Sequence, residues 1–137
     1  MIRSQRELLI HAPVERVWRL HTDVAAWPVW NSGIDRVAPT GTLTVGSSFR
    51  WRSHGLAVSS TVIALTPGRH ITWEGPAAGI HEVHRWTFTA IGDNTLARTE
   101  ETWSGPRVDA DPQGLRAELT QSLTVWLTDL KRTTECK

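Results

Sequence analysis

The sequence predicts an α+β fold in which a curved, seven-stranded antiparallel sheet wraps around one long C-terminal helix. The segment from Asp111 to about Thr134 is the only long one with a helical period. From Ile34 onward the chain before it has a period of two, broken at short intervals by turn residues. Two short helices are expected between the first strand and the second. A chain of 137 residues can bury a hydrophobic core, so we expect residues 1–137 to form a single domain.

The predicted C-terminal helix is amphipathic. Its apolar residues recur at spacings of three and four, so one stripe has to face a core. Asp111 suits the N-cap and Pro112 suits the first helical position. A helix of about 20 residues is about 30 Å long, so it needs a sheet of similar length to lie on. The stripe consists of Leu115, Leu119, Leu123, Trp126 and Leu130.

The N-terminal part reads as one strand followed by a helix pair. Gln5 to His11 alternates as a strand does, and Ala12-Pro13 ends it. Val14 to Thr22 is expected to be a short helix that follows Pro13. Asp23 is a candidate cap for a second short helix, which ends at Asn31 before Ser32-Gly33.

Six further strands are expected after the helix pair. Short turns rich in Gly, Pro, Asn and Asp separate them, which favours an antiparallel up-and-down meander. The strand from 56 to 65 has apolar residues on both faces, so its inward face is left open. The six segments are Ile34 to Val37, Ser47 to Ser53, Leu56 to Leu65, Arg69 to Gly75, Gly79 to Ile91 and Thr95 to Trp103.

Charge and composition exclude several classes of partner. The net charge is +1, with acidic and basic residues intermixed, so nucleic acid is not expected as a partner. No apolar run approaches the ~20 residues that a membrane span needs, and the N-terminus lacks the apolar core of a secretion signal. We therefore expect a cytoplasmic protein without membrane insertion. The single cysteine, Cys136, is expected to be an exposed thiol.

Several patterns together resemble a known superfamily. They are Ile10-His11-Ala12-Pro13-Val14-Glu15-Arg16-Val17-Trp18, Trp27-Pro28-Val29-Trp30-Asn31 after Asp23, Gly46 before a strand, Pro67-Gly68-Arg69 up to Trp73, Trp86-Thr87-Phe88 and the Leu/Trp-rich last helix. The chain resembles the helix-grip (SRPBCC) superfamily, which contains START lipid-transfer domains, birch-pollen-allergen-like proteins and polyketide cyclases/dehydrases. The resemblance runs from end to end and implies a deep cavity between the sheet and the last helix.

Polar side chains on the inward strand faces are the candidate catalytic residues. Glu82 and His84 share one face, and Glu101 is expected on the neighbouring strand. Two flanking acids would favour the charged imidazole, and such a group could orient a carbonyl or move a proton. Two other readings stay open: these residues are solvated at the open end of the sheet, or they form an internal salt bridge with a lysine or arginine.

Aromatic residues are the candidate ligand-binding residues. The chain has eight tryptophans, two phenylalanines and no tyrosine. Trp27, Trp30 and Asn31 are expected at the cavity entrance, or alternatively pack the short helices on the sheet. The remaining candidates, on the cavity walls, are Phe49, Trp51, Trp73, Trp86, Phe88, Trp103, Leu119, Leu123 and Trp126.

No metal or cofactor is expected. His81 and His84 are three apart in a predicted strand, so they point to opposite faces, and no cysteine, histidine or carboxylate set has zinc-like spacing. The sequence also lacks a glycine-rich phosphate loop and a nucleophile elbow.

Three functions remain open at this level. The first is a polyketide cyclase/dehydratase-like enzyme that uses acid/base chemistry without a cofactor. Its weakness is the absence of tyrosine, because aromatase/cyclases commonly use phenolic and arginine groups, and Arg50, Arg52 and Arg85 are predicted to face outward. The second is a carrier or sensor of a hydrophobic, planar or polyketide-like small molecule. The third is a chaperone-interacting domain that uses the outer sheet face. Either a monomer or a homodimer is compatible with the sequence.

Overall fold

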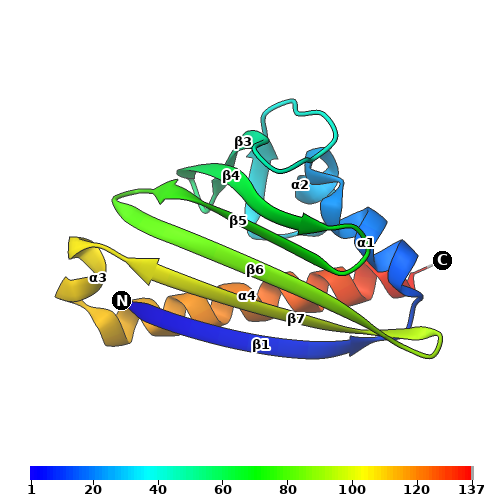
Figure 1. Cartoon of the computed structure of the whole chain (residues 1–137). Coiled ribbons are helices and arrows are strands. Elements are labelled where there is room, and N and C mark those ends of the chain that lie inside the picture. Colours follow the sequence, from blue (N-terminus) through cyan, green and yellow to red (C-terminus); the bar gives the residue numbers. More distant parts are fainter. Residues whose placement is uncertain (137) are drawn as a thin grey trace.

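The computed structural model describes residues 1–136 and confirms the predicted helix-grip architecture. One seven-stranded sheet curls beside a long C-terminal helix, α4, and short helices cover one end (Figure 1). The elements in chain order are β1 (Ile2–Ile10), α1 (Val14–Thr22), the 3₁₀ turn η1 (Val24–Ala26), α2 (Trp27–Trp30), β2 (Ile34–Val37), β3 (Ser48–Ser53), β4 (Leu56–Thr66), β5 (His70–Ala77), β6 (Ile80–Ile91), β7 (Asn94–Ser104), α3 (Pro106–Ala110) and α4 (Pro112–Glu135).

The strands from β2 to β7 form the predicted antiparallel meander. The strand order in the sheet is β1-β7-β6-β5-β4-β3-β2, so the first strand pairs with the last. β1 and β2 therefore lie at opposite edges of the sheet, and the segment with α1, η1 and α2 crosses one end of the sheet to connect them (Figure 1). None of the helices within residues 1–136 is both long and apolar enough to cross a membrane.

α4 follows the predicted pattern at its start and along its length. The side chain of Asp111 accepts a hydrogen bond from the backbone N–H of Gly114 at 3.1 Å, and Pro112 occupies the first turn. The predicted stripe from Leu115 to Leu130 is buried. Asp129 of the same helix is also largely buried, and its carboxylate accepts hydrogen bonds from both the backbone N–H and the hydroxyl of Ser32 at 2.8 Å.

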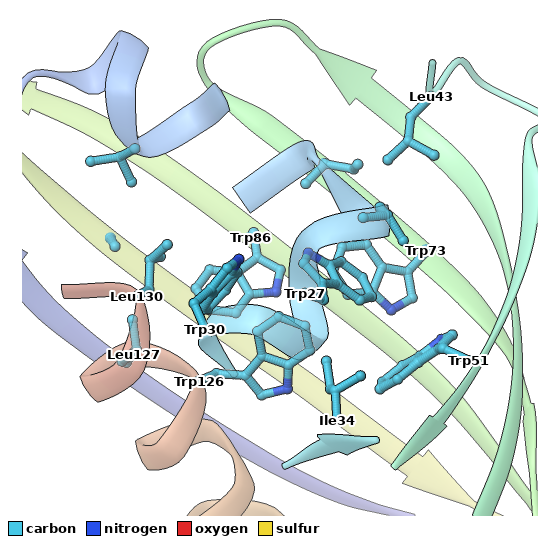
Figure 2. Close-up of a cluster of buried hydrophobic side chains, with 14 of the residues drawn as sticks. Trp27, Trp30, Ile34, Leu43, Trp51, Trp73, Trp86, Trp126, Leu127 and Leu130 are labelled. Carbon is cyan, nitrogen blue, oxygen red and sulfur yellow. The ribbon is translucent and has the colours of Figure 1, made fainter. Parts of the chain in front are cut away.

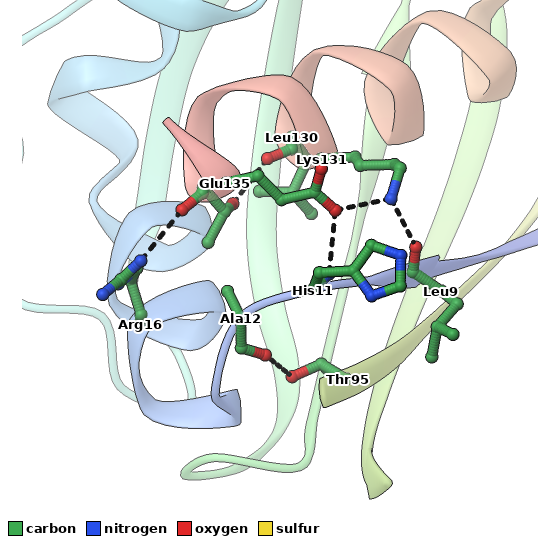
Figure 3. Close-up of polar contacts among 9 residues, drawn as sticks. Leu9, His11, Ala12, Arg16, Thr95, Leu130, Lys131 and Glu135 are labelled. Atoms are coloured by element: carbon green, nitrogen blue, oxygen red, sulfur yellow. Dashed lines mark hydrogen bonds and ion pairs between the residues drawn. The ribbon is translucent and has the colours of Figure 1, made fainter. Parts of the chain in front are cut away.

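Polar contacts attach the C-terminal end of α4 to β1 (Figure 3). The Lys131 ammonium donates a hydrogen bond to the carbonyl of Leu9 at 2.9 Å. The Glu135 carboxylate accepts from the same ammonium and, at 2.8 Å, from the backbone N–H of His11. These contacts fix the register between the last helix and the first strand.

Some predicted boundaries were wrong. β1 begins at Ile2 and not at Gln5, because its ladder with β7 continues to the pair Ile2–Trp103. The helix α3 was not predicted. Its first turn contains Pro106, and proline is a turn residue that the first turn of a helix also accommodates well. The Asp23 side chain does not form the expected cap hydrogen bond.

The structure assigns the inward face of β4, which the sequence left open. Val58, Ser60 and Val62 are buried, and a register shift follows between Val62 and Ala64. β4 lies unusually close to β5 at Gly75, where a Cβ atom would stand 1.8 Å from the Ser59 carbonyl oxygen. Only glycine permits this approach of the two strands.

The buried apolar side chains form two clusters. The larger is rich in aromatic rings and lies between α1, α2, the sheet and the C-terminal half of α4. The smaller lies near α3 and the N-terminal half of α4, and it comprises Ile2, Ile80, Val108, Leu115, Leu119 and Leu123. In β6, Glu82 and His84 lie between Ile80 of the smaller cluster and Trp86 of the larger. Polar side chains therefore occupy the junction of the two clusters.

Candidate functional site

The larger cluster brings most of the predicted aromatic residues together (Figure 2). Trp126, on α4, is its hub: its ring centroid lies 4.9 Å from that of Trp27 and 5.6 Å from that of Trp86. Trp27 contacts Trp51 in turn, at 5.4 Å. Most of these pairs are tilted or edge-to-face, the arrangements that the ring quadrupoles favour.

These rings occupy the space between the sheet and α4. Three hollows open elsewhere on residues 1–136, and none of the three lies between the sheet and α4. The first, of about 560 Å³, lies between α1, the segment 40–43 and the β4–β5 turn, with Trp18 and Leu43 in its walls. The second, of about 810 Å³, is on the outer side of β2–β5, and the third, of about 310 Å³, is on the outer side of the sheet over β6 and β7. The cavity around α4 therefore stays a prediction.

His84 and Glu101 are brought together as the alternation predicted. They are opposite each other in the β6–β7 ladder, and both are buried. The distance from His84 Nδ1 to Glu101 Oε1 is 3.1 Å. The other ring nitrogen, Nε2, lies 2.8 Å from Thr99 Oγ1, and the Thr99 hydroxyl lies 3.3 Å from the Arg85 carbonyl oxygen. Neither the solvated arrangement nor a salt bridge to lysine or arginine describes this pair.

Burial favours the neutral forms of both groups. It lowers the pKa of His84 well below its usual value, and the nearby His21 lowers it further. Burial also raises the pKa of Glu101, the neighbouring Glu82 raises it further, and the indole N–H of Trp103 opposes the rise with a hydrogen bond of 2.7 Å. Burial therefore opposes the charged imidazole that the two flanking acids were expected to favour.

The neutral forms suit a directional chain of hydrogen bonds. A protonated Glu101 donates to Nδ1 of His84, the Nε2–H of His84 donates to Thr99, and Thr99 donates to the carbonyl of Arg85. Every donor then has an acceptor. A proton can move between Glu101 and His84 without either side chain changing place. General acid/base chemistry requires in addition a reacting atom of a substrate within hydrogen-bond reach of one of the two groups.

Glu82 lies at the edge of this group. It is only partly buried, and burial raises its pKa to about 7. A carboxyl group with a raised pKa stabilises the fold in its protonated form, so this contribution is complete below about pH 4.5 and is lost as the pH rises to about 7.

Replacing Glu82 by glutamine should therefore flatten the pH dependence of stability. Between pH 4.5 and pH 8 we expect the wild type to lose about 2–3 kcal/mol more of its free energy of unfolding than the variant does. Urea unfolding followed by circular dichroism at both pH values measures it. Glu118→Gln, at an exposed position of α4, should leave the profile unchanged, and parallel curves for Glu82→Gln would contradict the assignment.

His21 is a site residue that the sequence analysis missed. It is fully buried on α1, and its ring centroid lies 4.4 Å from that of Trp86. Neither of its ring nitrogens has a hydrogen-bond partner among the described residues, nor has the indole nitrogen of Trp86. Burial lowers the pKa of His21 to about 3. Its place on the apolar side of the helix with Val14 and Val17 was the available signal.

The helix pair contributes two further unpartnered nitrogens. The side-chain oxygen of Asn31 accepts from the backbone N–H of Gly33 at 2.9 Å, while its amide nitrogen and the indole nitrogen of Trp30 have no partner among residues 1–136. Trp27 differs, because its indole N–H donates to the carbonyl of His21 at 2.7 Å. Trp27, Trp30 and Asn31 are all buried, so they pack between the helix pair and the rest of the core.

A comparison with protein families identifies the chain. The sequence model of a family described as "Polyketide cyclase / dehydrase and lipid transport" matches residues 1–135. The chain belongs to this family. The match spans the sheet, the short helices and all of α4. The family supports a hydrophobic-ligand-binding fold for the protein.

Solved structures of other proteins share the fold of this polyketide cyclase/dehydrase family member. An aromatase/cyclase, Zhui, from Streptomyces sp. R1128 is 15% identical, with 98% of this chain and 93% of that chain covered and a TM-score of 0.83. A START superfamily protein from Mycobacterium smegmatis is 17% identical, with 97% of each chain covered and a TM-score of 0.80. The Aha1 dimer from Colwellia psychrerythraea is 18% identical, with 99% and 98% covered and a TM-score of 0.79. A search of curated protein sequences finds no significant match.

In this family member the predicted site residues divide between the two clusters and their junction. Leu119 and Leu123 belong to the smaller cluster, with Trp103 packed against it. Glu82, His84 and Glu101 lie at the junction. The residues of the larger cluster are Trp27, Trp30, Phe49, Trp51, Trp73, Trp86, Phe88 and Trp126. Their roles toward a ligand stay predictions.

Proposed function

We propose that the protein binds a hydrophobic, planar small molecule between the sheet and α4, and that a polar group of this molecule is held at His21 and Trp86, beside His84. The observation that carries the proposal is the set of unpartnered nitrogens on His21 and Trp86, beside the buried His84–Glu101 pair. A buried polar atom without a partner costs about 1–3 kcal/mol. A ligand carbonyl or hydroxyl that pairs with them recovers this free energy.

The aromatic surroundings favour a flat ligand. Trp73, Trp86 and Trp126 present ring faces and edges around the same imidazoles, at centroid distances of 4.9–5.6 Å from His84. Ring stacking contributes about 0.5–1.5 kcal/mol per pair beyond the area it buries. Because these rings contact one another, a ligand has to displace one of them. The hollow beside Trp18 and Leu43 supplies a route from the surface, since Trp18 packs against Phe88 of the ring cluster at 5.8 Å.

Tryptophan fluorescence tests this proposal with two probes of matched shape. Fluorenone carries a carbonyl and fluorene does not. We expect saturable quenching by both, and we expect Trp86→Phe to weaken fluorenone binding about five- to tenfold while leaving fluorene binding nearly unchanged, because only fluorenone loses a hydrogen bond. Absence of saturable quenching over a panel of flat apolar compounds would refute the proposal.

Catalysis is the second candidate, favoured by the His84–Glu101 pair. The pair holds one transferable proton in a buried place beside the proposed polar subsite, as cyclisation or dehydration of a carbonyl compound requires. Incubation with poly-carbonyl compounds and mass analysis separates an enzyme from a carrier. A loss of 18 mass units that His84→Gln and Glu101→Gln abolish supports dehydration, and an isomer of the same mass but different chromatographic retention supports cyclisation. Recovery of the substrate unchanged in both mass and retention supports a carrier.

A further inference from the structure

The outer face of the sheet carries an uneven distribution of charge. Over β1, β6 and β7 two arginines share an acidic partner: Arg3 and Arg85 both lie near Glu100, with N–O distances of 3.9 Å and 3.2 Å. The hollow of about 310 Å³ in this region includes two arginines and two glutamates. Charges here are balanced.

Over β2 and β3 the arginines have no acidic partner. Arg36, Arg50 and Arg52 line the hollow of about 810 Å³ on the outer side of β2–β5, and no Asp or Glu is among its lining residues. None of the three forms an ion pair with another residue in the range 1–136. The only side-chain hydrogen bond among them runs from Arg52 to the carbonyl of Gly55, at 3.0 Å.

The register makes this arrangement costly. Arg36 is directly opposite Arg52 in the β2–β3 ladder, and Arg50 lies two residues further along the same face of β3. Like charges directly opposite each other in neighbouring strands destabilise a sheet. The chain as a whole has a net charge of only +1, so three unbalanced arginines around one hollow are a local concentration.

We propose that this hollow binds a soluble organic phosphate. The planar guanidinium presents several N–H donors that match phosphate oxygens, and three of them suit two or more negative charges. The hollow is larger than an inorganic ion needs, and Pro39, Ala57 and Pro76 give it apolar walls for an organic body. The backbone N–H of Ala38 donates to the carbonyl of Arg50 at 2.9 Å, which holds the segment with Pro39 against β3. This site is independent of the ligand proposed between the sheet and α4.

Isothermal titration calorimetry with adenosine 5′-diphosphate as the probe tests the proposal. We expect saturable binding that weakens steeply between 50 and 300 mM salt, and no binding of uncharged adenosine. Arg36→Gln, Arg50→Gln and Arg52→Gln should each weaken binding at least fivefold. Arg3→Gln and Arg85→Gln on the balanced part of the same face are the matched controls and should change binding less than twofold. Fluorenone binding should be unaffected by any of the five changes.

Several outcomes would overturn the proposal. One is the absence of saturable heat with the diphosphate. Another is an equal loss of affinity for the diphosphate in Arg85→Gln and Arg50→Gln, which would indicate unspecific electrostatic attraction. Equally tight binding of inorganic phosphate would show that the apolar walls contribute nothing. Vesicles of phosphatidylcholine with phosphatidic acid serve as a further probe. Binding to these vesicles without binding of the soluble diphosphate would assign the arginines to a lipid headgroup.

The stability of the variants tests the like-charge contact itself. Unfolding followed by circular dichroism should show that Arg36→Gln and Arg52→Gln are at least as stable as the wild type, since each removes a like-charge pair.

Discussion

Replacing Trp126 by alanine is expected to lower the free energy of unfolding by about 3–5 kcal/mol, the range for truncation of a large aromatic side chain in a core. Trp126 is the residue through which α4 contacts the rest of the larger cluster. Its ring lies within 6.3 Å, centroid to centroid, of rings on α1, α2, β3, β5 and β6. Removing the indole leaves a cavity bordered by rigid rings, which cannot easily close around it.

Urea unfolding followed by far-UV circular dichroism measures this loss without relying on tryptophan emission. Thr124→Ala, two residues earlier on the exposed side of the helix, is the control, and we expect it to change the free energy of unfolding by no more than about 0.5 kcal/mol. Trp126→Phe should fall between the two, because it keeps a ring at the same place. A loss below about 1 kcal/mol for Trp126→Ala would show that the rings repack and that the helix is held mainly by other contacts.

The fold could be predicted because its elements have clear periods. The stripe from Leu115 to Leu130 has only one way to be buried, and the alternation in β6 places Glu82 and His84 on one face whatever the tertiary context. The short turns then make neighbours antiparallel. The pairing of β1 with β7 joins the first strand to the last, and no local pattern encodes it.

The site could be predicted only in part. Strand alternation was enough to bring Glu101 next to His84, since both positions were known to face inward. Alternation says nothing about depth, and depth decides the protonation of this pair, because the cost of burying charge depends on everything that covers it. The same limit applies to the cavity. Eight tryptophans can line a space or fill it, and composition alone does not distinguish the two.

Acid should destabilise the wild type through His21, which is fully buried. The pKa of a free histidine is about 6.5, and burial lowers that of His21 to about 3. Between these values the unfolded chain binds a proton that the folded protein rejects, so stability falls as the pH decreases. From pH 6.5 to pH 4.5 this amounts to about 2–3 kcal/mol. Among the other buried titratable groups, His84 acts in the same direction, and Glu101 and Glu82 act in the opposite one.

His21→Phe isolates this contribution, because the other groups are common to both proteins. At pH 7.5 the variant should be as stable as the wild type or more stable, since an apolar ring replaces two unpartnered nitrogens at little cost in volume. At pH 4.5 its advantage should grow by about 2–3 kcal/mol. His11→Gln, at an exposed position, should keep the wild-type profile. If the curves of wild type and His21→Phe run parallel from pH 7.5 to pH 4.5, folding does not lower the pKa of His21. The imidazole would then have a hydrogen-bond partner in the folded protein, which would contradict the polar subsite proposed at His21.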